Sequence, residues 1–253
     1  MKKIFALFTL LFIFSLQVFS QAKTESDLLT AHETDARVPS LDKFHKVIYP
    51  IWHKYWPNKD WEGFKKMVPD VEKYAEDIYK AELPGILRDK KDTWNKAVEE
   101  LKVCVENYKK DANNNDTTAL LKSAEKLHAQ YEFMVRLVNP ITKELDDFHK
   151  VLYNIYHYYM PEWQFDKLKE AINELAEKAK ILKDSELKKP AKFTPESKKR
   201  YDQRNEKYTK AVAKLCAEVD NVVKIMETKD KDKIKKAIEK MHSAYQATEN
   251  IFD

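Results

Sequence analysis

The sequence contains very little glycine and cysteine, with 2 residues of each among 253. A protein built of strands needs many tight turns, and a chain with so little glycine can form few tight turns. Charged residues make up 35% of the chain, and a high charged content fits long helices with solvated faces. The composition therefore predicts an all-α protein.

The sequence also lacks a strong excess of charge of one sign. It has 46 Lys and Arg against 42 Asp and Glu, a formal net charge of +4. This balance gives no reason to expect nucleic acid or an anionic membrane surface as a partner. The chain has no glycine-rich phosphate loop and no nucleophile next to a base, so ordinary kinase or hydrolase chemistry is disfavoured.

Only one long hydrophobic run is present, from residue 4 to about residue 19. Lys2 and Lys3 precede it and Ser20, Gln21 and Ala22 follow it, which is typical of a secretory signal peptide. We therefore expect residues 1–22 to be a signal peptide, and the protein to be exported to the periplasm or the extracellular space. Since no second run follows, we expect no stable membrane insertion after cleavage.

Two cysteines in an exported chain raise the question of a disulfide. Cys104 falls on the apolar face of its predicted helix, with Leu101 and Tyr108, whereas Cys216 falls toward the edge of its own helix. A bridge between them would need a particular packing of the two halves. A disulfide and a buried thiol beside a half-exposed one both remain open.

Most of the chain is repeated. The segment LDKFHKVIYPIWHKYWP at residues 41–57 recurs 104 positions later as LDDFHKVLYNIYHYYMP. Two further matches lie 114 positions apart: KAVEEL with KAVAKL, and AEKLHAQY with IEKMHSAY. The second copy therefore has ten extra residues between its second and third helices. We expect a tandem duplication, with residues 23–139 forming the first unit and residues 140–253 the second.

Each copy shows four stretches with hydrophobic residues at helical spacing. In the first copy they are residues 40–56, 60–82, 86–111 and 117–138, and Asp116 is well placed to cap the last one. Short connections between long helices predict an up-down-up-down four-helix bundle in each unit. Pro50 and Pro69 should kink their helices, but the second copy has Asn154 and Asn173 in their places.

Six of the seven histidines form three repeated pairs. Counted at about 1.5 Å per residue, His45 and His128 lie at nearly the same height on antiparallel helices, and so do His149 and His242. Each of them follows a carboxylate by three positions, on the same helix face. The remaining pair, His53 and His157, leans outward. These two histidines are either ligands at the opening of the site or exposed side chains. The candidate metal ligands are His45, His128, Asp42, Glu125 and His53 in the first unit, and His149, His242, Asp146, Glu239 and His157 in the second.

A carboxylate and a histidine three residues apart on a bundle helix resemble the ligand motif of ferritin-like di-iron proteins. That resemblance implies an inward Glu on each remaining helix, whereas Glu106 and Asp220 point away from the core. A simpler site with two histidines and one or two carboxylates is therefore predicted in each unit. Zinc and copper are the expected metals, because neutral imidazole binds both.

Two alternatives remain open. Histidines on the first and last helices are also similar to the axial ligands of soluble b-type four-helix cytochromes, which implies haem. Large aromatic residues such as Trp52 and Tyr131 leave little room for it. The other alternative is a structural or protein-interaction bundle without a cofactor, in which histidines and tyrosines hold helix register and the protein partner is unknown.

Overall fold

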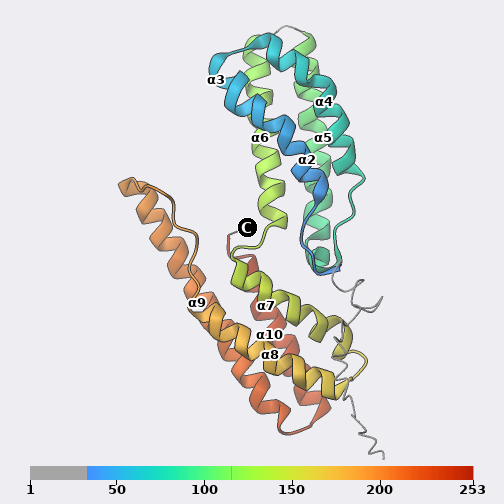
Figure 1. The fold of residues 1–253 in the computed structure, drawn as a ribbon, viewed down its shortest axis with the longest axis vertical. Helices are drawn as coiled ribbons and strands as arrows, with labels where there is room; N and C mark the ends of the chain where they lie inside the picture. The colour runs from blue at the N-terminus through green and yellow to red at the C-terminus, as the bar shows by residue number, and fades with distance from the viewer. Residues whose placement is uncertain (1–32, 115, 253) are drawn as a thin grey trace, which may run out of the picture.

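The computed structural model describes residues 33–114 and 116–252, and this part of the chain is helical with no strand (Figure 1). The all-α prediction is confirmed. The predicted signal peptide lies outside the described residues. No helix of the described part is long and apolar enough to cross a membrane.

The helices from α2 to α6 enclose one hydrophobic core and are called here the N-terminal group. Along the chain, α2 packs on α4, α4 on α5 and α5 on α6, and α6 returns to α2. The elements are α2 (Pro39–Pro50), the π-helix η1 (Ile51–Tyr55), α3 (Trp56–Asn58), α4 (Trp61–Tyr79), the 3₁₀-helix η2 (Gly85–Lys90), α5 (Lys91–Asn113) and α6 (Thr117–Val138).

The helices from α7 to α10 enclose a second core and form the C-terminal group. Here too each helix packs on the next one along the chain. The elements are α7 (Lys143–Asn154), the π-helix η3 (Ile155–Tyr159), α8 (Phe165–Lys183), α9 (Pro195–Met226) and α10 (Lys231–Glu249). Figure 1 shows the two groups following each other along the longest axis of the molecule.

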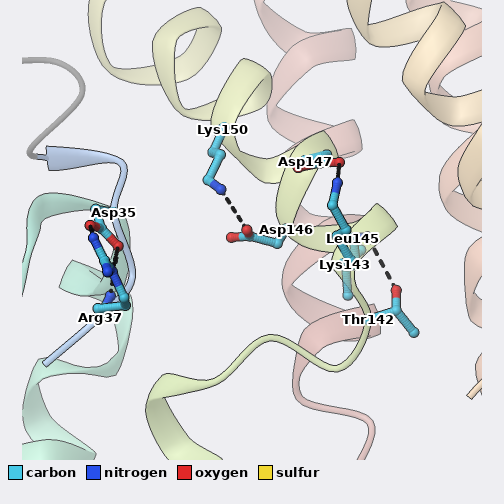
Figure 2. Close-up of polar contacts among 8 residues, drawn as sticks. All are labelled: Asp35, Arg37, Thr142, Lys143, Leu145, Asp146, Asp147 and Lys150. Carbon is cyan, nitrogen blue, oxygen red and sulfur yellow. Dashed lines mark hydrogen bonds and ion pairs between the residues drawn. The ribbon is translucent and has the colours of Figure 1, made fainter. Parts of the chain in front are cut away.

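Capping side chains mark the starts of several helices, among them α6 and α7. Asp116 accepts hydrogen bonds from the backbone N–H groups of Thr118 and Ala119, so the predicted cap of α6 is confirmed. Thr142 caps α7 by accepting from Leu145 N (Figure 2). Such side chains satisfy N–H groups that have no partner within the helix.

Both groups contain a π-helix at the same place in the repeat, η1 in one and η3 in the other. Pro50 precedes η1, but Asn154 stands at the corresponding position before η3. The proline is therefore not needed for the distortion. A π-turn holds an extra residue and changes the direction of the side chains that follow it, and such turns often occur at functional sites. His53 lies in η1 and His157 in η3.

The ten extra residues of the second copy change the start of its third helix. Helix α9 has 32 residues against 23 in α5. Its first buried side chain is Tyr208, so the part before this residue extends beyond the core. In Figure 1 this end of α9 projects away from the other helices. In the first copy, η2 takes the place of the predicted helix start at residue 86.

The two cysteines are free thiols. Cys216 is buried and its Sγ lies 3.4 Å from Ala179 O, whereas Cys104 is only half-buried. The helical phase predicted that Cys104 would be the more buried cysteine and Cys216 the more exposed one, and this prediction was wrong. Cys104 lies between the main apolar stripe and solvent, because Leu101, Val105 and Tyr108 take the innermost positions of α5.

Candidate functional site

In the N-terminal group, each of two predicted histidine ligands stacks on an aromatic ring from the opposite helix. His45 of α2 lies parallel to Tyr131 of α6, with ring centroids 5.8 Å apart. His128 of α6 lies parallel to Trp52 of η1, with centroids 4.2 Å apart. The two histidines thus lie in one seam, and the ring contact of each is with an aromatic residue.

The C-terminal group repeats this arrangement at the equivalent positions. His149 of α7 stacks on Tyr245 of α10 at 4.2 Å, and His242 of α10 stacks on Tyr156 of η3 at 3.8 Å. The π-helix brings the third histidine close as well, since the rings of His157 and His242 are 6.3 Å apart and perpendicular. The two groups therefore share a set of ring contacts between their first and last helices.

A row of three side chains runs along the first helix of each group. Tyr49 contacts His45 at a centroid distance of 5.8 Å and His53 at 4.6 Å. Tyr153 occupies the same place between the other two histidines of its group, at 6.4 and 4.7 Å. We call these the N-terminal and the C-terminal histidine row: His45, Tyr49 and His53, and His149, Tyr153 and His157.

The two rows differ in exposure. Tyr49 is 55% exposed, whereas Tyr153 is 1% exposed and belongs to the core of the N-terminal group. His45 and His53 are exposed, whereas His149 is buried and His157 is half-buried. The C-terminal row is covered because η2 of the N-terminal group packs on α7. The N-terminal row stays open to solvent.

The cover of the C-terminal row is polar. Arg88 of η2 donates from Nη2 to Tyr153 Oη, and its Nη1 lies 3.2 Å from His157 Nδ1. Tyr153 also donates to Glu33 Oε2 at 3.0 Å, and Tyr158 donates to the same oxygen. We call these five side chains the inter-group cluster: Glu33, Arg88, Tyr153, His157 and Tyr158.

Two further residues of η2 contact α10. Asp89 Oδ2 lies 3.8 Å from His242 Nε2 and accepts a hydrogen bond of 2.8 Å from Gln246 Nε2. Lys90 lies 3.3 Å from Glu249 Oε1, in an ion pair with little exposure. The 3₁₀-turn thus presents consecutive charged residues to the C-terminal group.

Burial keeps the imidazoles of the C-terminal group neutral. It lowers the pKa of His149 to about 3, with smaller contributions from His242 and Lys90. It lowers the pKa of His157 to about 4, helped by the Arg88 cation. In the N-terminal group, burial also lowers the pKa of His128. The carboxylate of Glu132, 3.6 Å from Nε2, opposes this effect, and His53 and His45 add to it. A neutral imidazole has a lone pair and can accept a hydrogen bond or bind a metal.

The carboxylates predicted as metal ligands are either ion-paired or exposed. Asp146 pairs with Lys150 at 2.6 Å (Figure 2). Asp42, Glu125 and Glu239 are exposed. Across residues 33–114 and 116–252, no group of three or more His, Cys, Asp or Glu side chains is placed to hold a metal ion.

Sequence reasoning missed Glu33, Arg88 and Asp89, because none of them belongs to the repeated pattern. One signal was present, since Pro84-Gly85 between two helical stretches indicates a turn, and charged residues follow it at positions 88–90. Comparisons with protein-family models, curated proteins and solved structures give no match to this chain.

Proposed function

We propose that the protein is exported, that it consists of two copies of an up-down-up-down four-helix unit, and that the first copy binds a transition-metal ion, zinc or copper. The ligands in this proposal are His45, His53 and His128. The repeated helix packing supports the duplication, since two histidines of each group stack on aromatic rings at equivalent positions.

The observation that carries the metal proposal is that three histidines, two of them exposed and one half-buried, lie near one another where α2 and η1 meet α6. His128 is close enough to His53 and to His45 for both to lower its pKa. Two of the three side chains are exposed, so their rings can turn toward a common ion at little cost. Three histidines are a known ligand set for zinc. Asp42 and Glu125, one turn before two of them, orient the imidazoles in this proposal.

The three equivalent histidines of the C-terminal group have a different role in our proposal. Arginine can only donate hydrogen bonds, so Nδ1 of His157 accepts from Arg88. The proton of this neutral ring then sits on Nε2, and neither nitrogen has a free lone pair. We therefore propose that His149, His157 and His242 hold the two units together, and that a metal would bind there only after Arg88 had moved.

The test is a titration of the metal-free mature chain with zinc and with copper, followed by elemental analysis. We expect one ion per chain. His53→Gln should weaken binding about tenfold or more, because it removes one of three ligands. His157→Gln, the equivalent change in the second copy, should leave stoichiometry and affinity unchanged. If the wild-type chain binds no metal, or if both variants bind like wild type, the proposal is wrong.

A second candidate function is a protein-interaction module. The C-terminal row already binds a polypeptide segment, η2, through its tyrosine hydroxyl and a histidine nitrogen. The N-terminal row carries the same residue types and is open. Under this function, Tyr49→Ala would abolish the capture of a partner and leave metal content unchanged. The metal proposal expects metal binding without any partner.

Haem binding is supported less than metal binding or protein interaction. The cavity beside His149 and Tyr245 has a volume of only about 10 Å³, far less than a porphyrin needs. Protein that stays colourless after titration with haem would remove this alternative.

A further inference from the structure

The projecting start of α9 is the main departure of the second copy from the first. From Pro195 to Lys207 the helix has no buried residue. Its contacts in this part are mostly with the connector before it: Tyr201 Oη donates to Leu187 O at 3.0 Å, and Asn205 Oδ1 accepts from Leu187 N at 3.1 Å. A helix gains most of its stability from packing, so this extension does not serve the core.

An open groove of about 730 Å³ lies along this extension. One side is formed by the basic residues of α9 and the other by Ile251 and Phe252, which follow α10. The cations that line it are Arg200, Arg204, Lys207 and Lys210, against a single carboxylate, that of Glu206.

Among the described residues, one of these four cations has an ion-pair partner. Glu206 pairs with Lys210 at 2.6 Å. Within the described part of the chain, no carboxylate oxygen lies within 4.0 Å of a charged nitrogen of Arg200, Arg204 or Lys207. The guanidinium of Arg204 lies 3.9 Å from the centre of the Phe252 ring, which holds it in place. Three cations of the groove thus have no carboxylate partner among residues 33–114 and 116–252, and one of these cations is held against an aromatic ring.

These three cations share one face of the helix. They stand at positions i, i+4 and i+7, and about 1.5 Å of rise per residue spreads them over about 10 Å. Such a line fits an extended ligand with a repeating negative charge better than a single small anion. The two guanidinium groups match planar or three-oxygen anionic groups in a bidentate way.

We propose that this groove binds a linear acidic polysaccharide through its carboxylate or sulfate groups. Single-stranded nucleic acid is disfavoured, because its binding needs several free aromatic faces for base stacking, and Arg204 covers Phe252. The inference is independent of the metal proposal, since the groove contains none of the histidines.

The experiment measures binding of the full mature chain to four fluorescent probes at low salt. They are a sulfated heparin oligosaccharide, a carboxylated oligogalacturonate, a neutral dextran and an oligo-dT strand. We expect one or both acidic sugars to bind, dextran not to bind, and affinity to fall as NaCl screens the charges. The two acidic sugars distinguish sulfate from carboxylate recognition.

The triple variant Arg200→Gln/Arg204→Gln/Lys207→Gln should lose at least tenfold in affinity. The matched control removes the same charge from exposed lysines of the N-terminal group, as Lys110→Gln/Lys122→Gln/Lys126→Gln, and should change affinity less than twofold. Circular dichroism confirms that both variants fold. The proposal is overturned if no acidic sugar binds, if the control loses as much as the groove variant, or if oligo-dT binds more tightly than both sugars.

Discussion

Arg88 Nη1 lies 3.2 Å from His157 Nδ1, a contact between a 3₁₀-turn of the N-terminal group and a π-helix of the C-terminal group. Since arginine has no acceptor atom, the contact assigns the proton of the neutral imidazole to Nε2. It also places a permanent positive charge next to a ring that must stay neutral. The join between the two groups therefore depends on the protonation state of His157.

Replacing Arg88 with Gln should raise the pKa of His157. The pKa is about 4, and burial is the larger cause with the Arg88 cation second. Without the cation we expect the pKa to rise but to stay below the ordinary 6.5, because burial remains. A histidine NMR titration measures this directly. Arg37→Gln is the control, since Arg37 is exposed and pairs with Asp35 (Figure 2). An unchanged pKa in the Arg88 variant would contradict the contact.

Stability should fall as the pH decreases from 6.5. His149 has a pKa of about 3 in the folded protein, so between these values the unfolded chain binds more protons than the folded one. One such histidine lowers the free energy of unfolding by about 1.4 kcal/mol for each unit that the pH falls within this range. His149→Phe keeps the ring stack on Tyr245 and should reduce this slope in urea unfolding at pH 7, 6 and 5. His45→Phe, at the exposed equivalent position, is the control variant for the loss of a histidine.

Gly85 should be hard to replace, because an added Cβ would overlap Tyr153 Oη. Tyr153 is buried and its hydroxyl is fixed by Arg88 and Glu33, so it cannot easily move. We expect Gly85→Ala to cost about 1–3 kcal/mol of unfolding free energy. Tyr153→Phe removes the overlapping oxygen, so the double variant should lose less than the sum of the two single variants. Purely additive losses in urea unfolding would argue against the close approach.

Tyr108 should stabilise the N-terminal core through its hydroxyl. The ring is fully buried, and Oη donates to Phe64 O at 2.7 Å, which joins α5 to α4. Tyr108→Phe leaves that carbonyl without this donor and should cost about 1–2 kcal/mol. Tyr49→Phe, at an exposed position, should stay within about 0.5 kcal/mol of wild type. Equal losses in the two variants would show that the hydrogen bond is not the cause.

The sequence by itself determined the helical class and most helix positions. Hydrophobic spacing located the helices of both groups, and Asp116 marked the start of α6 correctly. These features depend on residues close together along the chain, so local rules suffice. The matching sequence segments also singled out the histidines of the helix–helix seams, because His128 and His242 stand at equivalent places in them.

Only the tertiary structure decided what those histidines contact. Their rings stack on Trp52, Tyr131, Tyr156 and Tyr245, which helix heights alone did not identify. The π-helices were also unforeseen, since Pro50 before one and Asn154 before the other give no common local signal. The contrast between an open and a covered histidine row arises from η2, whose Arg88 meets His157 across 69 positions of sequence. Such a contact is set by how two packed groups of helices meet, and no local pattern of spacing, capping or composition encodes that geometry.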